Sequence, residues 1–291
     1  MTTKNALLGL WAEASIHAGA GSSVDGVDLP IQREGHSDWP CVFGSSVKGA
    51  LRTKTEDKLG KDNPSIAFVF GPDSTNDKAS EHAGALLVSD AKLLLLPVRS
   101  LTSHFKWVTC PALLQRLQRD VVRLGLDLQV GADFALEKSE AVVAKPEESG
   151  LFLEEYRFTT RTEDLTVLIK AIHQLTGIAL TDLTEQLAII SNDQFSYLAK
   201  YATPVTPHIA IDNDRKTVKP GALWYEETLP PETVLYFALS AHRSRAKDSD
   251  MPASAILNCI TQDLFGASPY LQLGGNETVG MGWCKVTVLE A

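Results

Sequence analysis

The sequence predicts an α+β fold, in which strands form a sheet and helices pack on one face of that sheet. Two observations indicate this class. Strand–helix–strand alternation occurs near both ends of the 291-residue chain, and a mixed region of strands and helices lies between them. Apolar residues make up 44% of the chain and charged residues 22%, which is enough for a well-packed core.

The N-terminal part begins with an apolar run at residues 7–16 that predicts a buried strand. Three glycines between residues 19 and 26 then predict a flexible loop. A helix is expected over residues 45–59, because apolar side chains recur four residues apart, a serine can cap its start and a glycine follows it. Residues 60–84 are rich in Asn, Pro, Asp, Ser and Gly, so we expect a loop with one packed anchor there.

The later elements are predicted from apolar runs and helical spacing in the same way. Strands are expected at residues 85–96 with an interruption at Ser89-Asp90, and at 98–107, 151–158, 233–239, 270–273 and 283–289. Helices are expected at residues 111–124, 162–191 (broken near Gly177) and 251–266.

Residues 203–228 have a different pattern from the rest of the chain. A stiff Thr-Pro-Val-Thr-Pro segment precedes a short strand, a polar tip lies at residues 212–216, and a second strand returns. This pattern predicts a projecting β-hairpin. An arm of this kind suits contact with a partner protein or a nucleic-acid strand.

The overall charge constrains the function. The formal net charge is −9 and the pI is near 5.3, which argues against a freestanding general RNA binder but allows a local basic groove. No run of about 18 apolar residues predicts a membrane span, and the N-terminus does not read as a signal peptide. The four cysteines form no CxxC pair, so reduced thiols in a cytoplasmic protein are expected.

Candidate functional residues concentrate in residues 16–52. His17 ends an apolar run, and Asp28 lies in a Gly/Ser-rich loop shortly before a proline. A second Gly/Ser turn opens the expected helix, with Lys48 and Arg52 four residues apart on one face. Free N–H groups at a helix start with nearby cations suit a phosphate, so phosphodiester chemistry or a grip on a nucleic-acid backbone is expected.

These motifs support a family resemblance. The chain resembles the RAMP superfamily of CRISPR proteins and, more narrowly, the repeated backbone subunit of the type III-B (Cmr) effector complex. The resemblance covers nearly the whole chain in order, and it is carried by His17-Ala18-Gly19, residues 27–34, 44–52, 70–71, 83–91, 97–100, 107–111, 153–155 and 208–227, and the glycine-rich loop at 274–282.

The resemblance implies a single RAMP domain over residues 1–291. It has an RRM-like (ferredoxin-like) palm, a helical insertion at about residues 110–200 and a β-hairpin thumb at about residues 203–226. In this family, subunits stack along a guide RNA and each thumb interrupts the guide–target duplex. The implied partners are guide crRNA, single-stranded target RNA, further copies of the chain and other CRISPR effector subunits, without a membrane.

The resemblance also implies endoribonuclease activity on the target RNA, within the complex and at regular intervals, by a loop aspartate. That aspartate falls on Asp28, with Asp25 as its rival. The 2′-OH would attack the adjacent phosphorus and leave a 2′,3′-cyclic phosphate and a 5′-OH. Asp28 can act as a base or hold a divalent ion, Mg²⁺ or Mn²⁺. The simpler interpretation is an aspartate that forms a turn before Leu29-Pro30.

Other residues have both a functional and a structural interpretation. His17 can donate to the phosphate or bind the guide, or it can be a strand-end histidine that bonds to local backbone. Lys48 and Arg52, with the serines Ser45 and Ser46, can bind guide phosphates or form a solvated helix face. Further candidates are Arg33 for RNA binding, Gly275, Gly280 and Gly282 for close approach of RNA or a plain hairpin turn, and Tyr225, Glu226 and Glu227 for completing the site or pairing with nearby cations.

Two other functions stay open at the level of the sequence. One is a structural guide-RNA-binding subunit that does not cut. The other is a RAMP endonuclease that processes precursor guide RNA, which the acidic charge balance disfavours.

Overall fold

A computed structural model describes residues 3–24, 26–72, 82–147 and 150–291. The helices among these residues are α1 (Gly44–Leu59), α2 (Pro64–Phe70), α3 (Pro111–Leu124), α4 (Thr166–Thr176), α5 (Leu180–Gln186), α6 (Asn192–Tyr201) and α7 (Ala253–Asn258), followed by short π and 3₁₀ turns η1 (Cys259–Leu264) and η2 (Glu277–Val279). The strands are β1 (Lys4–Ala12), β2 (Cys41–Val42), β3 (Leu86–Val88), β4 (Ala91–Arg99), β5 (Phe105–Thr109), β6 (Glu140–Val143), β7 (Leu151–Leu153), β8 (Tyr156–Thr162), β9 (Leu187–Ile190), β10 (Val205–Ile211), β11 (Val218–Glu227), β12 (Val234–Ala241), β13 (Tyr270–Gln272) and β14 (Trp283–Glu290).

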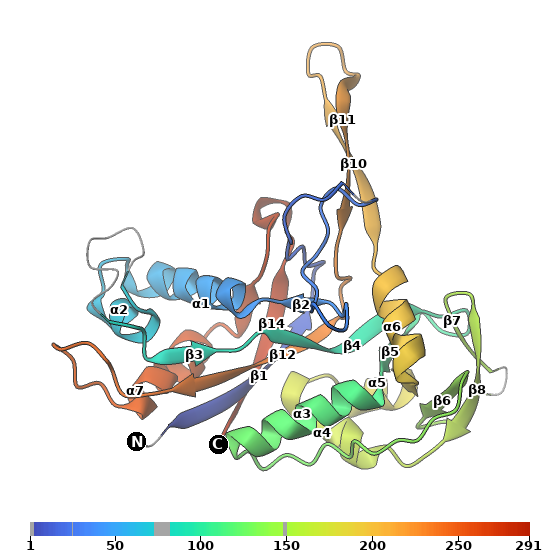
Figure 1. Cartoon of the computed structure of the whole chain (residues 1–291), viewed down its shortest axis with the longest axis horizontal. Helices are drawn as coiled ribbons and strands as arrows, with labels where there is room; N and C mark the ends of the chain where they lie inside the picture. Colours follow the sequence, from blue (N-terminus) through green and yellow to red (C-terminus); the bar gives the residue numbers. More distant parts are fainter. Residues whose placement is uncertain (1–2, 25, 73–81, 148–149) are drawn as a thin grey trace.

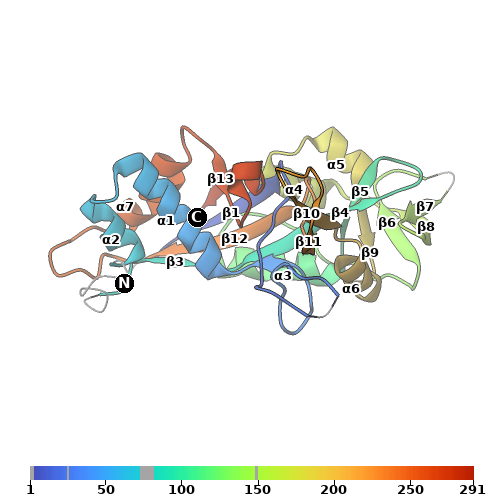
Figure 2. The same cartoon turned by 90° about the horizontal axis from the view of Figure 1, so that it is seen from above.

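One large mixed sheet organises the molecule. Its main path runs β13-β14-β1-β12-β4-β5-β9-β6-β8-β7, with β2 paired to β4 and β3 paired to β12. Most neighbours are antiparallel, whereas β5–β9 and β6–β8 are parallel. The mixed α and β composition agrees with the expected class. Figures 1 and 2 show α1, α2 and α7 toward one end of the sheet and α3 to α6 toward the other.

Helices cover both faces of the sheet, so the prediction of helices on one face was wrong. Leu8 of β1 packs in one apolar cluster with Val47 of α1 and Ile256 of α7. Its neighbour Leu7 packs in a second cluster with residues of helices α3, α4 and α5. Leu175 of α4 belongs to this cluster. The continuous apolar run in β1 is the pattern of a strand that is buried on both sides.

Several predicted elements are confirmed. Helices α1 and α3 lie where the apolar spacing placed them, and Gly177 ends α4 in a left-handed conformation. The interruption at Ser89-Asp90 separates β3 from β4. The C-terminal strand–loop–strand is the antiparallel pair β13–β14. The first strand, however, spans Lys4–Ala12, and residues 13–16 form a loop in which Ile16 is buried and Glu13 is exposed.

Three other predictions were wrong. Residues 60–84 contain α2, which begins with an Asn63 cap and Pro64 at its first position, both start signals for a helix. The run at 187–190 is the buried strand β9, which periodicity alone does not distinguish from a helix. Residues 151–158 fold back at Glu154 (φ 50°) into β7 and β8. The segment at 110–200 therefore contributes strands β6 to β9 as well as helices α3 to α6.

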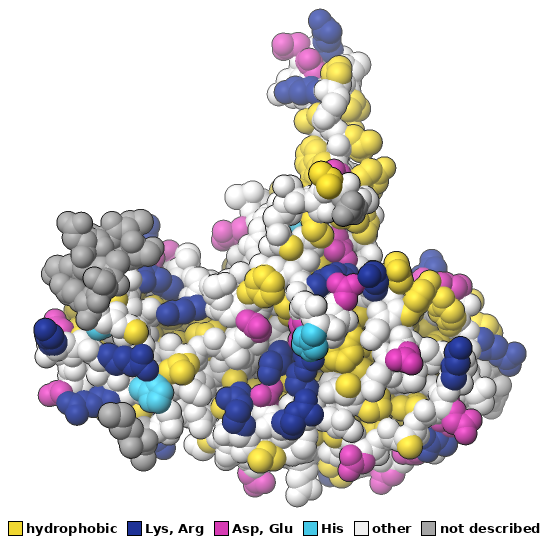
Figure 3. Space-filling model, in the orientation of Figure 1, with side chains coloured by type: hydrophobic (Ala, Val, Ile, Leu, Met, Phe, Trp, Pro, Cys, Tyr) yellow, Lys and Arg dark blue, Asp and Glu magenta, His cyan; other side chains and the backbone are white. Residues whose placement is uncertain are grey.

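The expected hairpin is present as a separate two-stranded sheet of β10 and β11. It projects from the body of the molecule in Figure 1. One face carries exposed apolar side chains, which include Ile209 and Leu223 at directly opposite positions. On the other face, the His208 and Trp224 rings stack with centroids 5.5 Å apart. Figure 3 shows apolar side chains along the hairpin and charged side chains at its tip.

Two remaining features are the state of the cysteines and the apolar character of the helices. All four cysteines are free, and burial raises the pKa of Cys41, Cys110 and Cys284 to about 12. Among the described residues, none of the helices combines the length and apolar character that crossing a bilayer requires.

Candidate functional site

The base of the hairpin brings together segments that lie far apart in the sequence. Leu29 bridges to Glu226 in a parallel arrangement, since its N–H donates to the Tyr225 carbonyl and its carbonyl accepts from the Glu227 N–H. The opposite edge of β11 pairs with β10. The loop at residues 17–34 therefore pairs through Leu29 with the free edge of β11, where the hairpin joins the body.

Asp28 is exposed and lies at this edge. Its Oδ2 accepts a hydrogen bond of 2.7 Å from the backbone N–H of Tyr225. The contact spans 197 positions of sequence, so the side chain is held by the hairpin and not only by its own turn. The second carboxylate oxygen has no hydrogen-bond partner among the residues described. The rival Asp25 lies outside the described residues.

His17 contacts the same edge two residues further along. Its Nδ1 lies 2.8 Å from the Glu227 carbonyl oxygen, which only accepts, so Nδ1 carries the hydrogen of this bond. The other ring nitrogen, Nε2, faces Gly19, where a Cβ atom would lie only 2.9 Å away. Residues two apart in a strand lie about 6.6–6.8 Å apart, so His17 and Asp28 flank the same short stretch of β11.

Glu227 is buried and paired with Arg33. Its Oε1 accepts from Arg33 Nη2 at 2.5 Å and from Thr203 Oγ1 at 2.6 Å, and its Oε2 accepts from the Ile31 N–H at 3.1 Å. Arg33 also donates to the Asp38 and Ala199 carbonyl oxygens. These contacts fix the loop to the hairpin base. A catalytic role for Glu227 and an RNA contact for Arg33 stay predictions.

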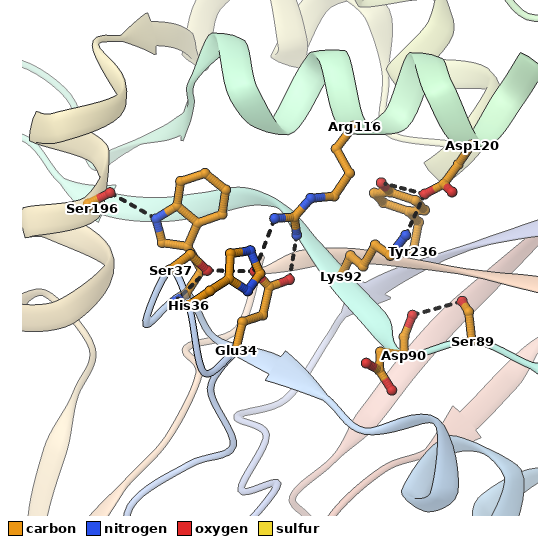
Figure 4. A network of polar contacts seen from close by, with 11 residues as sticks. Glu34, His36, Ser37, Ser89, Asp90, Lys92, Arg116, Asp120, Ser196 and Tyr236 are labelled. Atoms are coloured by element: carbon orange, nitrogen blue, oxygen red, sulfur yellow. Dashed lines mark hydrogen bonds and ion pairs between the residues drawn. The ribbon is translucent and has the colours of Figure 1, made fainter.

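A second set of polar contacts fixes residues 34–39, as Figure 4 shows. Both oxygens of Glu34 accept from Arg116 of α3, and Ser37 donates to Glu34 at 2.6 Å. The Arg116 guanidinium lies 5.2 Å from the Trp39 ring centre, and Trp39 donates to Ser196 of α6. Burial alone would raise the pKa of Glu34, but the hydrogen bonds from Arg116 and Ser37 outweigh it and lower the pKa.

The start of α1 differs from the predicted cap. Phe43 is the N-cap residue, and neither serine that follows caps the helix with its side chain. Asp90 accepts from the Gly44 N–H at 2.7 Å and supplies the negative charge at this end. Ser45 is exposed, whereas Ser46 accepts from Gln32 at 3.3 Å.

The two predicted cations of α1 lie on one side of the helix but differ in their partners. Lys48 is half-buried and makes no ion pair with any residue that the structure describes. Burial lowers the pKa of Lys48, and the charge of Arg52 lowers it further. Arg52 pairs with Glu56 at 2.7 Å and donates to the Gly71 carbonyl. Lys48 is thus the freer of the two for an outside anion.

The glycine-rich loop touches His17 directly. The Gly275 N–H donates to the His17 carbonyl at 2.8 Å, and a Cβ at Gly274 would lie 2.3 Å from that same oxygen. Gly280 is exposed with open space around it, whereas Gly282 is buried and a Cβ there would overlap the Leu273 carbonyl. Of the three predicted RNA-contacting glycines, Gly275 and Gly280 are exposed and Gly282 serves packing.

Sequence reasoning missed a groove of 830 Å³ between α1 and the C-terminal strands. Ser46 lines it at one end, and Lys54 and Lys58 lie one and two turns beyond Ala50 on the same helix face. Gly274 and the exposed Trp283 line the opposite wall. The i, i+4 spacing of Lys54 and Lys58 was a signal that the sequence did carry.

Gln32 and Asn276 were missed as partners of the site, and Glu226 was named only with two alternative roles. Gln32 is buried and ties the loop together, because it donates to the Gly19 carbonyl and accepts from the Phe43 N–H. The buried Glu226 accepts from Asn276 of the glycine-rich loop and lies 3.7 Å from His17 Nδ1. From the sequence alone, a buried Gln or Asn that holds a loop in place cannot be told from one that is exposed to solvent.

The comparisons with known proteins agree with this arrangement. The model of the RAMP superfamily matches residues 12–285. The chain belongs to the RAMP superfamily. The RAMP resemblance expected from the sequence is thereby confirmed.

Individual relatives point the same way. The RAMP chain is 36% identical to the CRISPR system Cmr endoribonuclease Cmr4 of Pyrococcus furiosus, over 98% of this chain and 95% of that protein. It also resembles the crystal structure of oligomeric Cmr4 from Pyrococcus furiosus, with a TM-score of 0.74, 30% identity and coverage of 100% and 99% of the two chains. A chain in the cryo-EM structure of the type III-B Cmr-beta complex bound to cognate target RNA has the same fold, with a TM-score of 0.74, 20% identity and coverage of 99% and 97%. The narrower resemblance to the Cmr subunit is confirmed as well.

Proposed function

We propose that this chain is the repeated, guide-RNA-binding backbone subunit of a type III-B CRISPR effector complex, and that it cleaves bound target RNA. It works in the cytoplasm with guide crRNA, target RNA, further copies of itself and other effector subunits. Its Pyrococcus furiosus relative is named an endoribonuclease, and a structural neighbour belongs to a complex bound to cognate target RNA. These names support the activity and the partners proposed for this chain.

The proposed architecture is a single RAMP domain with an RRM-like palm. The strand order β14-β1-β12-β4 supports it, because α1 follows β1 and α7 lies between β12 and β14. This is the βαββαβ order of a ferredoxin-like fold, with the segment at 110–200 inserted after β4 and β5. The hairpin of β10 and β11 is the thumb.

The observation that carries the proposal is the position of Asp28. It is an exposed carboxylate that is tethered by one oxygen to the base of a projecting hairpin, while its other oxygen has no hydrogen bond to any described residue. A loop that is fixed by buried contacts at Arg33 and Glu34 but bears an exposed acid at its tip is suited to act on a bound chain. The hairpin next to it carries an apolar face that can stack against displaced bases.

The reaction follows from these groups. The 2′-oxygen of the target forms a bond to the adjacent phosphorus, and the bond from phosphorus to the 5′-oxygen breaks. Asp28 takes the proton of the 2′-OH, and His17, when protonated, gives the proton of Nε2 to the leaving 5′-oxygen, which becomes the 5′-OH. The products are a 2′,3′-cyclic phosphate and a 5′-OH. Tyr225 holds Asp28 through its backbone N–H.

A divalent ion fits this site only together with RNA. Among the described residues no group of three or more His, Cys, Asp or Glu side chains can hold a metal ion. Mg²⁺ is commonly bound by one or two carboxylates plus phosphate oxygens and water. Asp28 and the phosphates of the bound strand would therefore hold Mg²⁺ or Mn²⁺, which would supply charge stabilisation.

The guide strand is proposed to run from the start of α1 to the glycine-rich loop. Ser45, Ser46 and Lys48 are placed for phosphate contacts near the helix start, with Arg52 one turn later. The groove runs along Lys54 and Lys58 and is lined on its other side by Gly274 and Trp283, whose ring is available for stacking, and Gly280 lies exposed in the same glycine-rich loop. Asp57 and Glu277 also line this groove, so the phosphate contacts of this chain of net charge −9 are proposed to rest on the local cations Lys48, Lys54 and Lys58.

The nucleophile gives a direct test. A target RNA is prepared with one 2′-deoxy nucleotide at a single mapped cut position, and the assembled complex is incubated with it in Mg²⁺ or Mn²⁺. We expect cutting to disappear at that position alone, and the remaining products to end in a 2′,3′-cyclic phosphate and a 5′-OH. Cutting at the deoxy position would refute the 2′-OH mechanism. Tight target binding without product under either ion would favour the structural, non-cutting subunit.

A further inference from the structure

Asn276 occupies an unusual place in the glycine-rich loop. Its backbone is left-handed, with φ 61° and ψ 28°, in a loop whose other positive-φ positions, such as Gly274 and Gly280, are glycine. Glycine satisfies such a conformation with less strain than any other residue, so asparagine is present for its side chain. That side chain reaches Glu226 of β11, and its amide nitrogen also lies 3.6 Å from Met281 Sδ of the same loop.

The Asn276 amide donates to Oε1 of Glu226. The Glu226 side chain is only 6% exposed, and the same Oε1 atom lies 3.7 Å from His17 Nδ1. Among the residues described, no lysine or arginine forms an ion pair with Glu226. A buried carboxylate requires hydrogen-bond donors, and among the described residues the Asn276 amide is the one that donates to Glu226, while the His17 imidazole lies beside it at 3.7 Å.

These contacts fix the direction of the His17 ring. Nδ1–H donates to the Glu227 carbonyl at 2.8 Å, and the Glu226 carboxylate lies beside the same nitrogen. The loop also approaches His17 through its backbone, because Gly275 donates to the His17 carbonyl. Nε2, which faces Gly19, is therefore the ring nitrogen without a hydrogen bond among the described residues, and we take it as the one that meets a bound phosphodiester. If the Asn276 amide were absent, Glu226 would lose its donor and could turn from the ring.

We propose that Asn276 is a positioning residue for target cleavage, which acts through Glu226 to hold His17 with Nε2 toward the scissile phosphate. This inference rests on the proposed function. It predicts that Asn276 affects the cutting step and not the binding of guide or target, since its amide is used inside the protein.

The test is a double-mutant cycle in the reconstituted complex with guide RNA. Asn276→Gly keeps the left-handed backbone and removes the amide, and Glu226→Gln removes the carboxylate charge. We expect Asn276→Gly to lower the single-turnover cutting rate at saturating target roughly tenfold, with target Kd unchanged. In the Glu226→Gln background the same change should have a clearly smaller effect, because the glutamine oxygen can still accept from Asn276 but no buried charge depends on that donor. Thr278→Ala, at an exposed position of the same loop, should cut at the wild-type rate.

Several results would overturn the inference. One is an unchanged cutting rate for Asn276→Gly, and another is an effect of the same size with and without Glu226→Gln. If Asn276→Gly does not assemble, Asn276→Asp tests the same point, because aspartate also accepts the left-handed backbone but repels Glu226. It should assemble and cut slowly, and failure of both variants to assemble would make Asn276 a folding residue only. If wild type cuts and Asp28→Asn does not, the proposed function stands whatever Asn276 does; if Asp28→Asn cuts fully, it is the proposed function that fails.

Discussion

The central sheet and the projecting hairpin differ in how their apolar side chains are covered. In β12 nearly every residue is buried, and Phe237 is 0% exposed. In the hairpin, Leu223 is 55% exposed and its cross-strand partner Ile209 is 49% exposed. The sheet strands thus hold the fold together, whereas the hairpin carries a face that the chain alone leaves open. Such a face indicates a surface for a partner or for nucleic-acid bases.

The hairpin is attached to the body through polar contacts at its base. Leu29 pairs with the edge of β11, and Arg33, Thr203 and Ile31 all contact the Glu227 carboxylate. Hydrogen bonds are directional, so these polar contacts fix the angle of the hairpin and the place of Asp28, beside the buried apolar residues Ile31 and Leu229.

The largest expected effect is a loss of stability when a buried side chain of the central sheet is removed. Phe237→Ala removes a fully buried ring from the cluster that joins β1 and β12 to α1 and α7. We expect the free energy of unfolding to fall by about 3–5 kcal/mol. Chemical denaturation of the isolated chain measures it.

The matched hairpin variant is Leu223→Ala. Its side chain is mostly in water, so we expect a change within about 0.5 kcal/mol. A loss comparable to that of Phe237→Ala would show that the hairpin is covered by the rest of the chain in solution, and would contradict the comparison.

A smaller, pH-dependent loss of stability is expected at the junction between the two regions, where Glu34 pairs with Arg116. The pKa of Glu34 is below its ordinary 4.5, so its contribution to stability is present above that value and is lost as pH falls through the lowered pKa. Glu34→Gln should cost about 1.5–3 kcal/mol at pH 7, because it removes the charge that Arg116 binds. The difference from wild type should shrink in acid.

Denaturation curves at pH 7, 5 and 3 measure this difference. Glu137→Gln serves as the control, since Glu137 is exposed and its carboxylate pairs with no cation in the described part of the chain. A Glu34→Gln deficit that stays constant from pH 7 to pH 3 would show that the Arg116 pair contributes nothing to the junction.

The parts of the fold that the sequence predicted are those with a local cause. Helix α3 begins at Pro111 and ends before Gly125, and the hairpin has stiff prolines and a polar tip, so each can be read from its own residues. Strand β9 could not be predicted in this way, because its four apolar residues become a strand only by pairing with β5 and β6. The second covered face of the sheet has the same origin, since it depends on where α3, α4 and α5 return.

The residues of the candidate site fall into the same two groups, those in local motifs and those whose roles depend on distant partners. The resemblance picked out Asp28, His17, Lys48 and the hairpin, all of which lie in recognisable motifs. It did not assign roles to Gln32 or Asn276, because their functions depend on partners 11 and 50 positions away. Nor did it separate Glu226, which faces His17, from Glu227, which pairs with Arg33. Only the opposite directions of successive side chains in a strand distinguish these two neighbours.

The most direct measurement of the central claim is the target-cutting rate of a complex assembled with Asp28→Asn in place of the wild-type chain. Asparagine keeps the size of the side chain and can still accept from Tyr225, but it cannot take up a proton. We predict a fall of at least about 100-fold, with guide loading and target affinity unchanged, and no change for the exposed control Asp127→Asn. Wild-type cutting by the Asp28→Asn complex would contradict the assignment of the cleavage site to the base of the hairpin.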